Sequence, residues 1–242
     1  MVENRPGAGG VLGVDAIAKA APDGYTIGLA GVGALGVDIG EPVKRPYDPA
    51  KDLVLISRAA GSPFILVATP ELKASSLGDV IKLAKAEPNR MSIGHGGNGT
   101  AMQLTALTFV SMADVKINVV PYRGTAPAVA DAIAGHVQLA IADPPPSMGA
   151  ISEGKLKAIA VSSKQRFPMF PDVQTFDEMG LKGFEITGCS GRSRMHEPSL
   201  SQRRPLFGCL CGTFSPSSRQ IRSMRLTFTT HPASRSMAAI RR

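Results

Sequence analysis

Two glycine-rich loops, each lying between a strand-like run and a helix-like run, constrain the fold of this chain most. The first loop spans residues 94–99 and follows Ser92 and Ile93. The second spans residues 121–125 and follows an alternating apolar run over residues 115–119. Alternation of apolar and polar residues indicates a strand, and an apolar period near 3.6 residues indicates a helix. The repeated order of strand, loop and helix predicts an α/β fold.

Capping residues and glycines mark where the helices begin and end. Thr100 and Gln103 form a T-x-x-Q capping box after the first loop, and Ser76 with Asp79 forms a second box. Gly135 is typical of the position just past the end of a helix, here the helix that follows the second loop. The residues predicted to face the core from the helix after the first loop are Leu104, Leu107 and Val110.

The other elements continue this alternation along the chain. Strands are predicted over residues 25–30, 53–56, 64–68, 137–142 and 156–161. A helix over residues 11–21 is predicted to turn Leu12, Ala16 and Ile17 inward. Asp143 follows a continuously apolar strand, so it is a turn or N-cap residue for a helix near Ser147, or it faces the glycine loops. Residues 31–34 form another ligand-facing loop or a flexible connection.

The two glycine loops predict a site for a small anion. In an open parallel sheet both loops lie at the carboxyl ends of strands, where ligands bind. Both loops also end at helix N-termini, whose free N–H groups and dipole favour negative charge. The alternative is that each loop is only a tight turn between a strand and a helix. Two such loops in succession favour the anion site.

The positive charge of the chain is concentrated near its C-terminal end. Residues 189–242 hold ten arginines, no lysine, all three cysteines and one acidic residue, Glu197, whereas residues 1–188 carry 17 basic and 18 acidic residues. A segment this charged and poor in apolar residues cannot offset its ordering entropy, so we expect it to be disordered. The favoured interpretation is a shifted reading frame after Gly188. An arginine-rich nucleic-acid arm and a zinc or redox site at Cys209 and Cys211 are the alternatives.

Several short motifs occur in an order and spacing that resemble one family. They are E-N-R-P-G-A-G-G from Glu3, A-P-D-G-Y-T from Ala21, Y-D-P from Tyr47, G-N-G-T from Gly97, V-P-Y-R-G from Val120 and P-D-V-Q-T from Pro171. The chain resembles the Bug family, the extracytoplasmic solute receptors of tripartite tricarboxylate transporters, over about residues 2–188. The resemblance implies a two-lobed periplasmic binding protein of type II-like architecture. Such receptors hold small carboxylates in a cleft between the lobes.

The resemblance also implies a division of the chain. Residues 1–69 would form part of the first lobe, residues 70–160 the second lobe, and residues 161–188 a return to the first lobe. The strands that cross between the lobes would lie near residues 64–68 and 157–161. The signal peptide, first strand and first glycine loop of the family do not precede Met1. We therefore expect a truncated chain with an incomplete first lobe and a non-native or disordered tail over residues 189–242.

The functional expectation is a non-catalytic, periplasmic receptor that is a monomer. Its partners would be a small organic acid and the membrane components of a tripartite tricarboxylate transporter, with no cofactor, no metal and no nucleic acid. No G-x-S-x-G elbow, P-loop lysine motif or H-E-x-x-H motif occurs in the sequence. The alternatives are the ligand-sensing effector domain of a transcription regulator and, third, an α/β enzyme.

Ten residues are predicted to contact the ligand. They are His95, Gly97, Asn98, Gly99, Thr100, Tyr122, Arg123, Gly124, Thr125 and Asp143. The glycines and Asn98 would present backbone amides, and Thr100 would donate its hydroxyl or cap its helix. Tyr122 is expected as a wall of the cleft, and Arg123 holds a carboxylate or remains solvated. Asp143 would accept a hydrogen bond from a ligand amine or hydroxyl, or serve a structural role.

Overall fold

The computed structural model describes residues 1–35 and 44–195 of the chain. The helices in these residues are η1 (Ala8–Gly10), α1 (Val11–Ala18), α2 (Leu77–Ala86), α3 (Ala101–Met112), α4 (Thr125–Ile133) and α5 (Pro144–Ser152). The strands are β1 (Ile27–Ala30), β2 (Leu53–Pro63), β3 (Ile65–Ala68), β4 (Ser92–His95), β5 (Asn118–Pro121), β6 (Leu139–Ala142), β7 (Lys157–Val161) and β8 (Thr187–Met195). The predicted α/β fold is confirmed.

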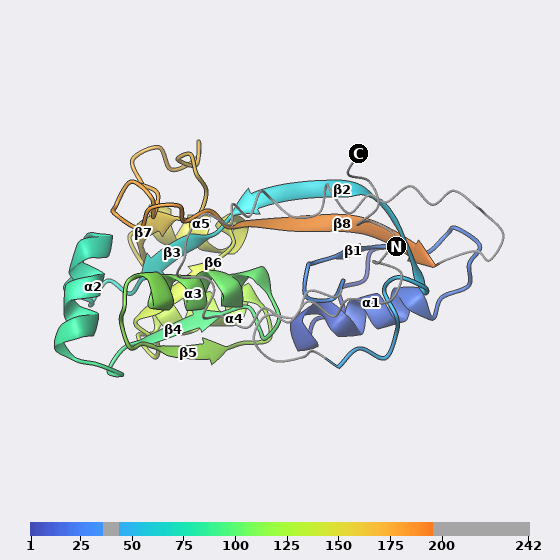
Figure 1. The fold of residues 1–242 in the computed structure, drawn as a ribbon, viewed down its shortest axis with the longest axis horizontal. Helices are drawn as coiled ribbons and strands as arrows, with labels where there is room; N and C mark the ends of the chain where they lie inside the picture. Colours follow the sequence, from blue (N-terminus) through green and yellow to red (C-terminus); the bar gives the residue numbers. More distant parts are fainter. Residues whose placement is uncertain (36–43, 196–242) are drawn as a thin grey trace, which may run out of the picture.

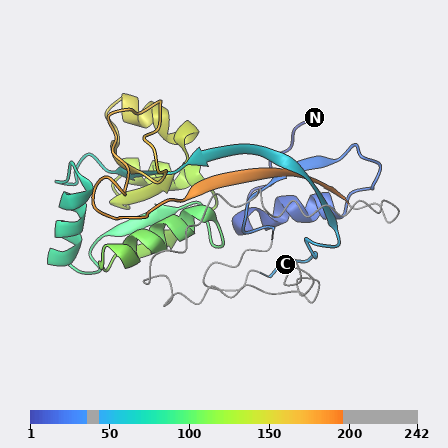
Figure 2. The same cartoon turned by 45° about the horizontal axis from the view of Figure 1, so that its top comes forward.

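The elements form two lobes joined by two long strands (Figure 1). The first lobe holds α1 and an antiparallel sheet in the order β1-β8-β2. The second lobe holds a mixed sheet in the order β5-β4-β6-β3-β7. β2 and β8 pair side by side and extend from one lobe into the other, as the second view also shows (Figure 2).

Parallel pairing places the two predicted glycine loops at one edge of the second sheet. β4 pairs with β5 on one side and with β6 on the other, both in parallel. β3 runs antiparallel to β6 with Ile65 opposite Ala142, so β3 begins at the edge where β4, β5 and β6 end. The chain therefore enters the second lobe beside the loops that follow these three strands.

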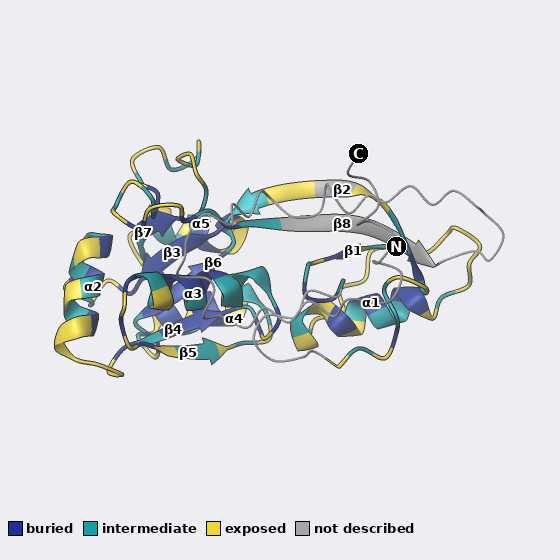
Figure 3. Cartoon of the chain, viewed as in Figure 1, coloured by how far each residue is buried: buried dark blue, intermediate teal, exposed yellow. Residues whose placement is uncertain are grey.

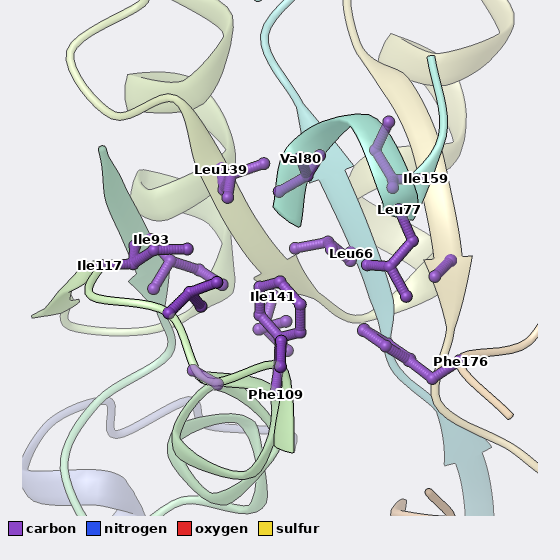
Figure 4. Close-up of a cluster of buried hydrophobic side chains, with 14 of the residues drawn as sticks. Leu66, Leu77, Val80, Ile93, Phe109, Ile117, Leu139, Ile141, Ile159 and Phe176 are labelled. Carbon is purple, nitrogen blue, oxygen red and sulfur yellow. The ribbon is translucent and has the colours of Figure 1, made fainter. Parts of the chain in front are cut away.

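Two apolar clusters cover the two faces of the second sheet. Along β3, Leu66 and Ala68 belong to the larger cluster, and Ile65 and Val67 belong to the smaller one. α2 and α3 pack in the larger cluster, and Figure 4 shows Leu77 and Val80 of α2 and Phe109 of α3 among its side chains. α4 packs in the smaller cluster. The sheet is therefore buried on both faces, as the continuously apolar pattern of β6 predicts (Figure 3).

The segment between β7 and β8 packs on the second lobe. Phe176 and Phe184 stack with ring centroids 4.2 Å apart, and both belong to the larger cluster of that lobe. The sequence predicts that the chain returns to the first lobe from residue 161. In the structure, Phe176 and Phe184 of the following segment pack in the second lobe. β7 ends at buried Val161, and the aromatic side chains of Phe176 and Phe184 beyond it cover the second sheet. The strands that cross are β2 and β8.

Contacts between residues distant in sequence determine which sides of α1 and α3 are buried and how long β2 is, and these differ from the predictions. Leu12 of α1 is exposed, because the helix buries Val11, Val14, Ile17 and Ala18 instead. α3 buries Thr105, Ala106, Thr108 and Phe109, while the predicted Leu104, Leu107 and Val110 are only partly buried. The strand expected over residues 53–56 extends to Pro63 because it pairs with β8.

Other boundaries also moved. The helix expected near Ser147 begins at Pro144, since proline is well tolerated in a first helical turn. The run over residues 115–119 becomes a strand only at Asn118. Residues 189–195, expected to be disordered, form most of β8, whose backbone pairs with both β1 and β2. Residues 196–242 of the expected tail lie outside the described residues. No helix within residues 1–35 and 44–195 has the length and apolar character needed to cross a bilayer.

Candidate functional site

Four loops from the two lobes meet at the carboxyl edge of the second sheet, and we call this meeting point the loop junction. It comprises residues 7–10 and 31–35 of the first lobe and residues 96–100 and 121–125 of the second. A Cβ atom placed on Gly97 would lie 3.1 Å from the Tyr122 carbonyl oxygen and 3.7 Å from the Gly9 backbone nitrogen. Both glycine loops of the second lobe thus contact each other, and one contacts the first lobe.

Two glycines of the first lobe are required for this close approach. A Cβ on Gly9 would overlap the carbonyl oxygen of Asn98, and a Cβ on Gly33 would overlap the carbonyl of Gly99. Gly9 also has a φ of +63°, a backbone conformation that side chains rarely adopt. Backbone therefore meets backbone across the two lobes, without room for a side chain between them.

Two hydrogen bonds hold the loop over residues 31–35. Arg45 donates from Nε to the carbonyl oxygen of Gly33 at 3.0 Å. Buried Tyr47 donates its hydroxyl to the carbonyl oxygen of Ala34 at 2.8 Å. Burial also raises the pKa of Tyr47 to about 12, so the phenol stays protonated and keeps donating. The loop is thus held by hydrogen bonds within its own lobe and also contacts the other lobe.

The N-terminus of α3 combines a capped donor with free donors. Thr100 accepts from the Gln103 N–H at 3.3 Å and donates its hydroxyl hydrogen to the Gly97 carbonyl at 2.7 Å. Its single hydroxyl hydrogen is therefore already used, and the capping role is the one this geometry supports. The N–H groups of Ala101 and Met102, in the first turn, have no hydrogen bond to another described residue.

The glycine amides of the first loop are mostly engaged within the second lobe. The Gly99 N–H donates to Gln103 Oε1 at 2.7 Å, so Gln103 reaches Gly99 instead of completing the box at Thr100. The Gly97 N–H lies 3.3 Å from His95 Nδ1. Asn98 is exposed, and its backbone N–H makes no hydrogen bond to another described residue. The donors that remain free are thus at Asn98 and in the first turn of α3.

His95 is a buried residue at the end of β4. Its side chain is 1% exposed, and burial lowers its pKa, so it is neutral near physiological pH. Nδ1 contacts the Gly97 backbone at both its N–H and its carbonyl oxygen, the latter at 3.1 Å. The His95 ring therefore stabilises the turn of the first loop through Nδ1, while Nε2 has no hydrogen-bond partner among the described residues.

The second loop leaves the N-terminus of α4 without a side-chain cap. Gly124 is the N-cap residue, with a φ of +116°, and it has no side chain to offer. Neither Thr125 nor Ala126 makes a backbone N–H hydrogen bond to another described residue, and Pro127 has no N–H. α4 thus presents two free donors at the same edge as α3.

Tyr122 and Arg123 of the second loop have different surroundings. The Tyr122 hydroxyl donates to Asp131 Oδ2 at 2.7 Å, and burial, with Asp131 next to it, raises the pKa of this phenol to about 12. Asp131 lies six residues beyond the start of α4, so the hydroxyl points about 9 Å along the helix from its N-terminus. Arg123 is exposed and forms no ion pair with a described residue. Tyr122 therefore packs against the smaller cluster of the second lobe, whereas Arg123 is exposed.

Asp143 lies at the end of β6, next to Thr125. The Thr125 hydroxyl donates to Asp143 Oδ2 at 2.9 Å and lies 3.4 Å from the Met102 sulfur, so α3, α4 and α5 meet here. Burial raises the pKa of the Asp143 carboxyl, and the Thr125 hydrogen bond partly opposes that shift. Asp143 is the N-cap residue of α5 yet caps no N–H, because residues 144–146 are all proline.

The sequence signals for part of this junction were not recognised. The predicted site contains neither Gly9 nor Gly33, although Gly33 lies in the loop over residues 31–34, for which the sequence offers a ligand-facing role as one of two interpretations. The three consecutive prolines after Asp143 are a local signal that α5 offers no donors in its first turn, and this signal was available. Ala101 and Met102 have no side-chain signature, because they take part through backbone position alone.

Residues 1–192 match the family described as the tripartite tricarboxylate transporter family receptor, TctC. The chain belongs to this family. It is 38% identical over 185 residues to protein BugT of Bordetella pertussis, a match that covers 76% of this chain and 57% of BugT. The chain thus spans little more than half the length of that receptor-family relative.

Solved structures of similar proteins agree with this family. One is a Rhodopseudomonas palustris protein with adipate, which is 28% identical and has a TM-score of 0.78. The match covers 81% of this chain and 66% of that protein. Another is MatC from the same organism with bound malate, at 28% identity and a TM-score of 0.71, covering 78% of this chain and 64% of MatC. The predicted two-lobed periplasmic binding fold is confirmed by these similarities, and TctC proteins are receptors for solutes.

Proposed function

We propose that this TctC family chain is a receptor that binds a small organic carboxylate at the loop junction. The observation that carries the proposal is the pair of free N–H donor sites at the starts of α3 and α4. Ala101 and Met102 in one first turn, and Thr125 and Ala126 in the other, have N–H groups without a described acceptor. Unpaired donors at two helix N-termini favour a negatively charged partner, because each helix dipole adds partial positive charge there.

The arrangement of the strands supports one shared site instead of two. α3 follows β4, α4 follows β5, and these two strands are parallel neighbours in register from Ser92 opposite Asn118. Strand neighbours lie about 4.8 Å apart, so the two helix starts lie within reach of one small molecule. A dicarboxylate has two negative groups at a comparable spacing. The two relatives solved with adipate and malate hold ligands of this chemical class.

The first lobe would complete the site by closing over it. Gly9 and Gly33 already approach the Asn98 and Gly99 carbonyls without intervening side chains. Closure of two lobes around a ligand removes water and strengthens each hydrogen bond to a charged group. The receptor would bind its ligand without catalysing a reaction.

The proposal extends to the setting of the protein. A receptor of this family would act in the periplasm as a monomer and deliver its ligand to the membrane components of a tripartite tricarboxylate transporter. It would need no cofactor, metal or nucleic acid.

Thermal unfolding with a panel of acids tests the proposal. Succinate, L-malate, adipate and citrate, each at about 10 mM, would be compared with succinamide, which has the same carbon skeleton as succinate and no charge. A ligand that binds only the folded state raises stability by RT ln(1 + [L]/Kd), about 2.7 kcal/mol when [L] is about 100 Kd. We expect at least one acid to raise Tm while succinamide does not. Equal shifts for potassium chloride and all four acids would contradict carboxylate binding.

A further inference from the structure

We propose that Asp143 makes the junction selective for carboxylates that carry a hydroxyl or ammonium group next to a carboxylate, an inference that rests on the proposed function. The carboxylate of Asp143 is the only acidic group on the three helix starts that meet at this edge, α3, α4 and α5. A negative charge opposes binding of a plain dicarboxylate. Its presence among anion donors therefore calls for a ligand that also brings a hydrogen-bond donor.

The three prolines after Asp143 leave its carboxylate without the partners of an ordinary N-cap. An N-cap aspartate normally accepts from the N–H groups of the second or third helical residue. Residues 144–146 are proline and have no N–H, and no side-chain cap bond forms. Asp143 Oδ2 accepts from Thr125, while Oδ1 has no hydrogen bond to another described residue. One carboxylate oxygen is therefore available for a ligand.

Thr125 places a donor and an acceptor next to each other. Its backbone N–H is a free donor in the first turn of α4. Its hydroxyl has given its single hydrogen to Asp143 at 2.9 Å, so this oxygen can only accept. A ligand carboxylate fits the N–H groups, and a hydroxyl or ammonium on the adjacent carbon fits the acceptors. That adjacency describes an α-hydroxy or α-amino carboxylate.

The close approach of Gly96 shows that these groups pack against one another. A Cβ on Gly96 would lie 2.8 Å from the Met102 sulfur and 3.5 Å from the Thr125 hydroxyl oxygen. The loop, the first turn of α3 and the first turn of α4 therefore converge within a side chain's length of Asp143. A site built to pair a ligand donor discriminates strongly against an analogue that lacks it, because the buried acceptor is then left unpaired.

Calorimetric titration with three four-carbon dicarboxylates tests the inference. Succinate, L-malate and L-aspartate share one skeleton and differ only at C2, which carries hydrogen, hydroxyl or ammonium. We expect the wild-type chain to bind malate or aspartate at least about tenfold more tightly than succinate. In Asp143→Asn, which keeps the shape and an acceptor for Thr125 but loses the charge, we expect this ratio to shrink to within about threefold.

Asp131→Asn is the matched control, since it removes the same charge from α4 at a carboxylate that pairs with Tyr122 instead. It should leave the ratio unchanged, and Asp143→Ser provides a second variant if the first does not fold. An equal affinity for all three acids in the wild type, or a ratio that Asp143→Asn leaves intact, would overturn this inference and leave the proposed function standing. Failure of the wild type to bind any acid of the wider panel would overturn both.

Discussion

The second lobe buries its apolar side chains in two clusters, one on each face of its sheet, whereas the first lobe has one smaller cluster around α1. Exposure follows the same division. In the part of the chain that the structure describes, seven of the nine exposed large hydrophobic residues lie within residues 1–56, and Tyr25, Ile27 and Leu29 are among them. The second lobe therefore has the core needed for independent stability, and the first lobe has less.

The lobes also differ in what they bring to the loop junction. The second lobe brings helix starts with free N–H groups, whereas the first lobe brings glycines at Gly9 and Gly33 that allow close contact. A ligand site built this way needs a rigid half that holds the donors and a closing half that excludes water. Stability and affinity should therefore respond to substitutions in different lobes.

The largest expected effect is on stability, at the centre of the second lobe. Phe176 is fully buried and contacts Phe109 and Phe184, with ring centroids 5.7 Å and 4.2 Å away. Phe176→Ala should lower the free energy of unfolding by about 3–5 kcal/mol, measured by urea denaturation. Tyr47→Phe in the first lobe removes one buried hydrogen bond and should cost only about 1 kcal/mol. Equal losses for the two variants would contradict the difference between the lobes.

Gly33→Ala should produce the next largest effect, on ligand affinity. The new Cβ would overlap the Gly99 carbonyl, so the two lobes cannot close as they do here. Loss of one hydrogen bond to a charged ligand costs about 1.5–3 kcal/mol, or about tenfold or more in Kd. Gly31→Ala is the control in the same loop, because a Cβ there meets nothing within 4 Å. Titration of the best acid from the panel should separate the two, and similar affinities would refute closure through Gly33.

Thr100→Val should change stability without changing affinity. The hydroxyl caps α3 and donates to Gly97, so its loss should cost about 1 kcal/mol of unfolding free energy. Ser76→Ala removes the cap of α2, away from the junction, and should cost about the same. Both variants should bind the acid within about threefold of the wild type. A tenfold loss for Thr100→Val alone would show that its hydroxyl contacts the ligand.

His95 should make stability depend on pH, with the smallest effect near neutrality. Burial lowers the pKa of His95 in the folded chain below its unfolded value of about 6.5. Below that pH the unfolded chain binds a proton that the folded chain resists, so the free energy of unfolding falls as pH falls. His95→Gln should flatten this fall below about pH 6.5. His136→Gln, at an exposed position, is the control, and equal pH profiles for both variants would contradict burial of neutral His95.

The sequence predicted those parts of the fold that depend on local signals. The Ser76 and Asp79 box forms as expected, and Gly135 ends α4 with a φ of +79°. The helix faces were harder to predict, because α1 and α3 bury the sides that meet partners far away in sequence. The length of β2 could not be read from its own residues, since its pairing with β8 joins positions more than 120 residues apart.

The candidate site divides in the same way. The loops after β4 and β5 were predicted because a strand, glycines and a cap lie close together in sequence. The backbone contact between Gly9 and Asn98 depends on how the two lobes pack together, and this packing cannot be predicted from a short stretch of sequence. Tyr122 was expected as a wall of the cleft, and its hydroxyl donates to Asp131, nine residues later. The contact that the Tyr122 side chain makes therefore depends on a neighbour in the folded chain, Asp131, and could not be predicted from the position of Tyr122 in the loop.

The central claim is that free backbone N–H groups at the starts of α3 and α4 bind a carboxylate, and Ala101→Pro tests it most directly. Ala101 is the first residue of α3, and proline is favoured there because its φ suits the helix and no intrahelical hydrogen bond is lost. Thr100 before it is already extended, with a ψ of 157°, as a residue preceding proline prefers. The substitution therefore removes one N–H donor with little change in the backbone.

The measurement is calorimetric titration of L-malate and succinate into the wild type, Ala101→Pro and Ala101→Val. Valine has as many side-chain carbons as proline and keeps the N–H, so it controls for bulk. We predict that Ala101→Pro weakens binding of the better acid by about tenfold or more, and that Ala101→Val changes it by less than about threefold. Equal affinities for the proline and valine variants, with both folded, would contradict carboxylate binding at the start of α3.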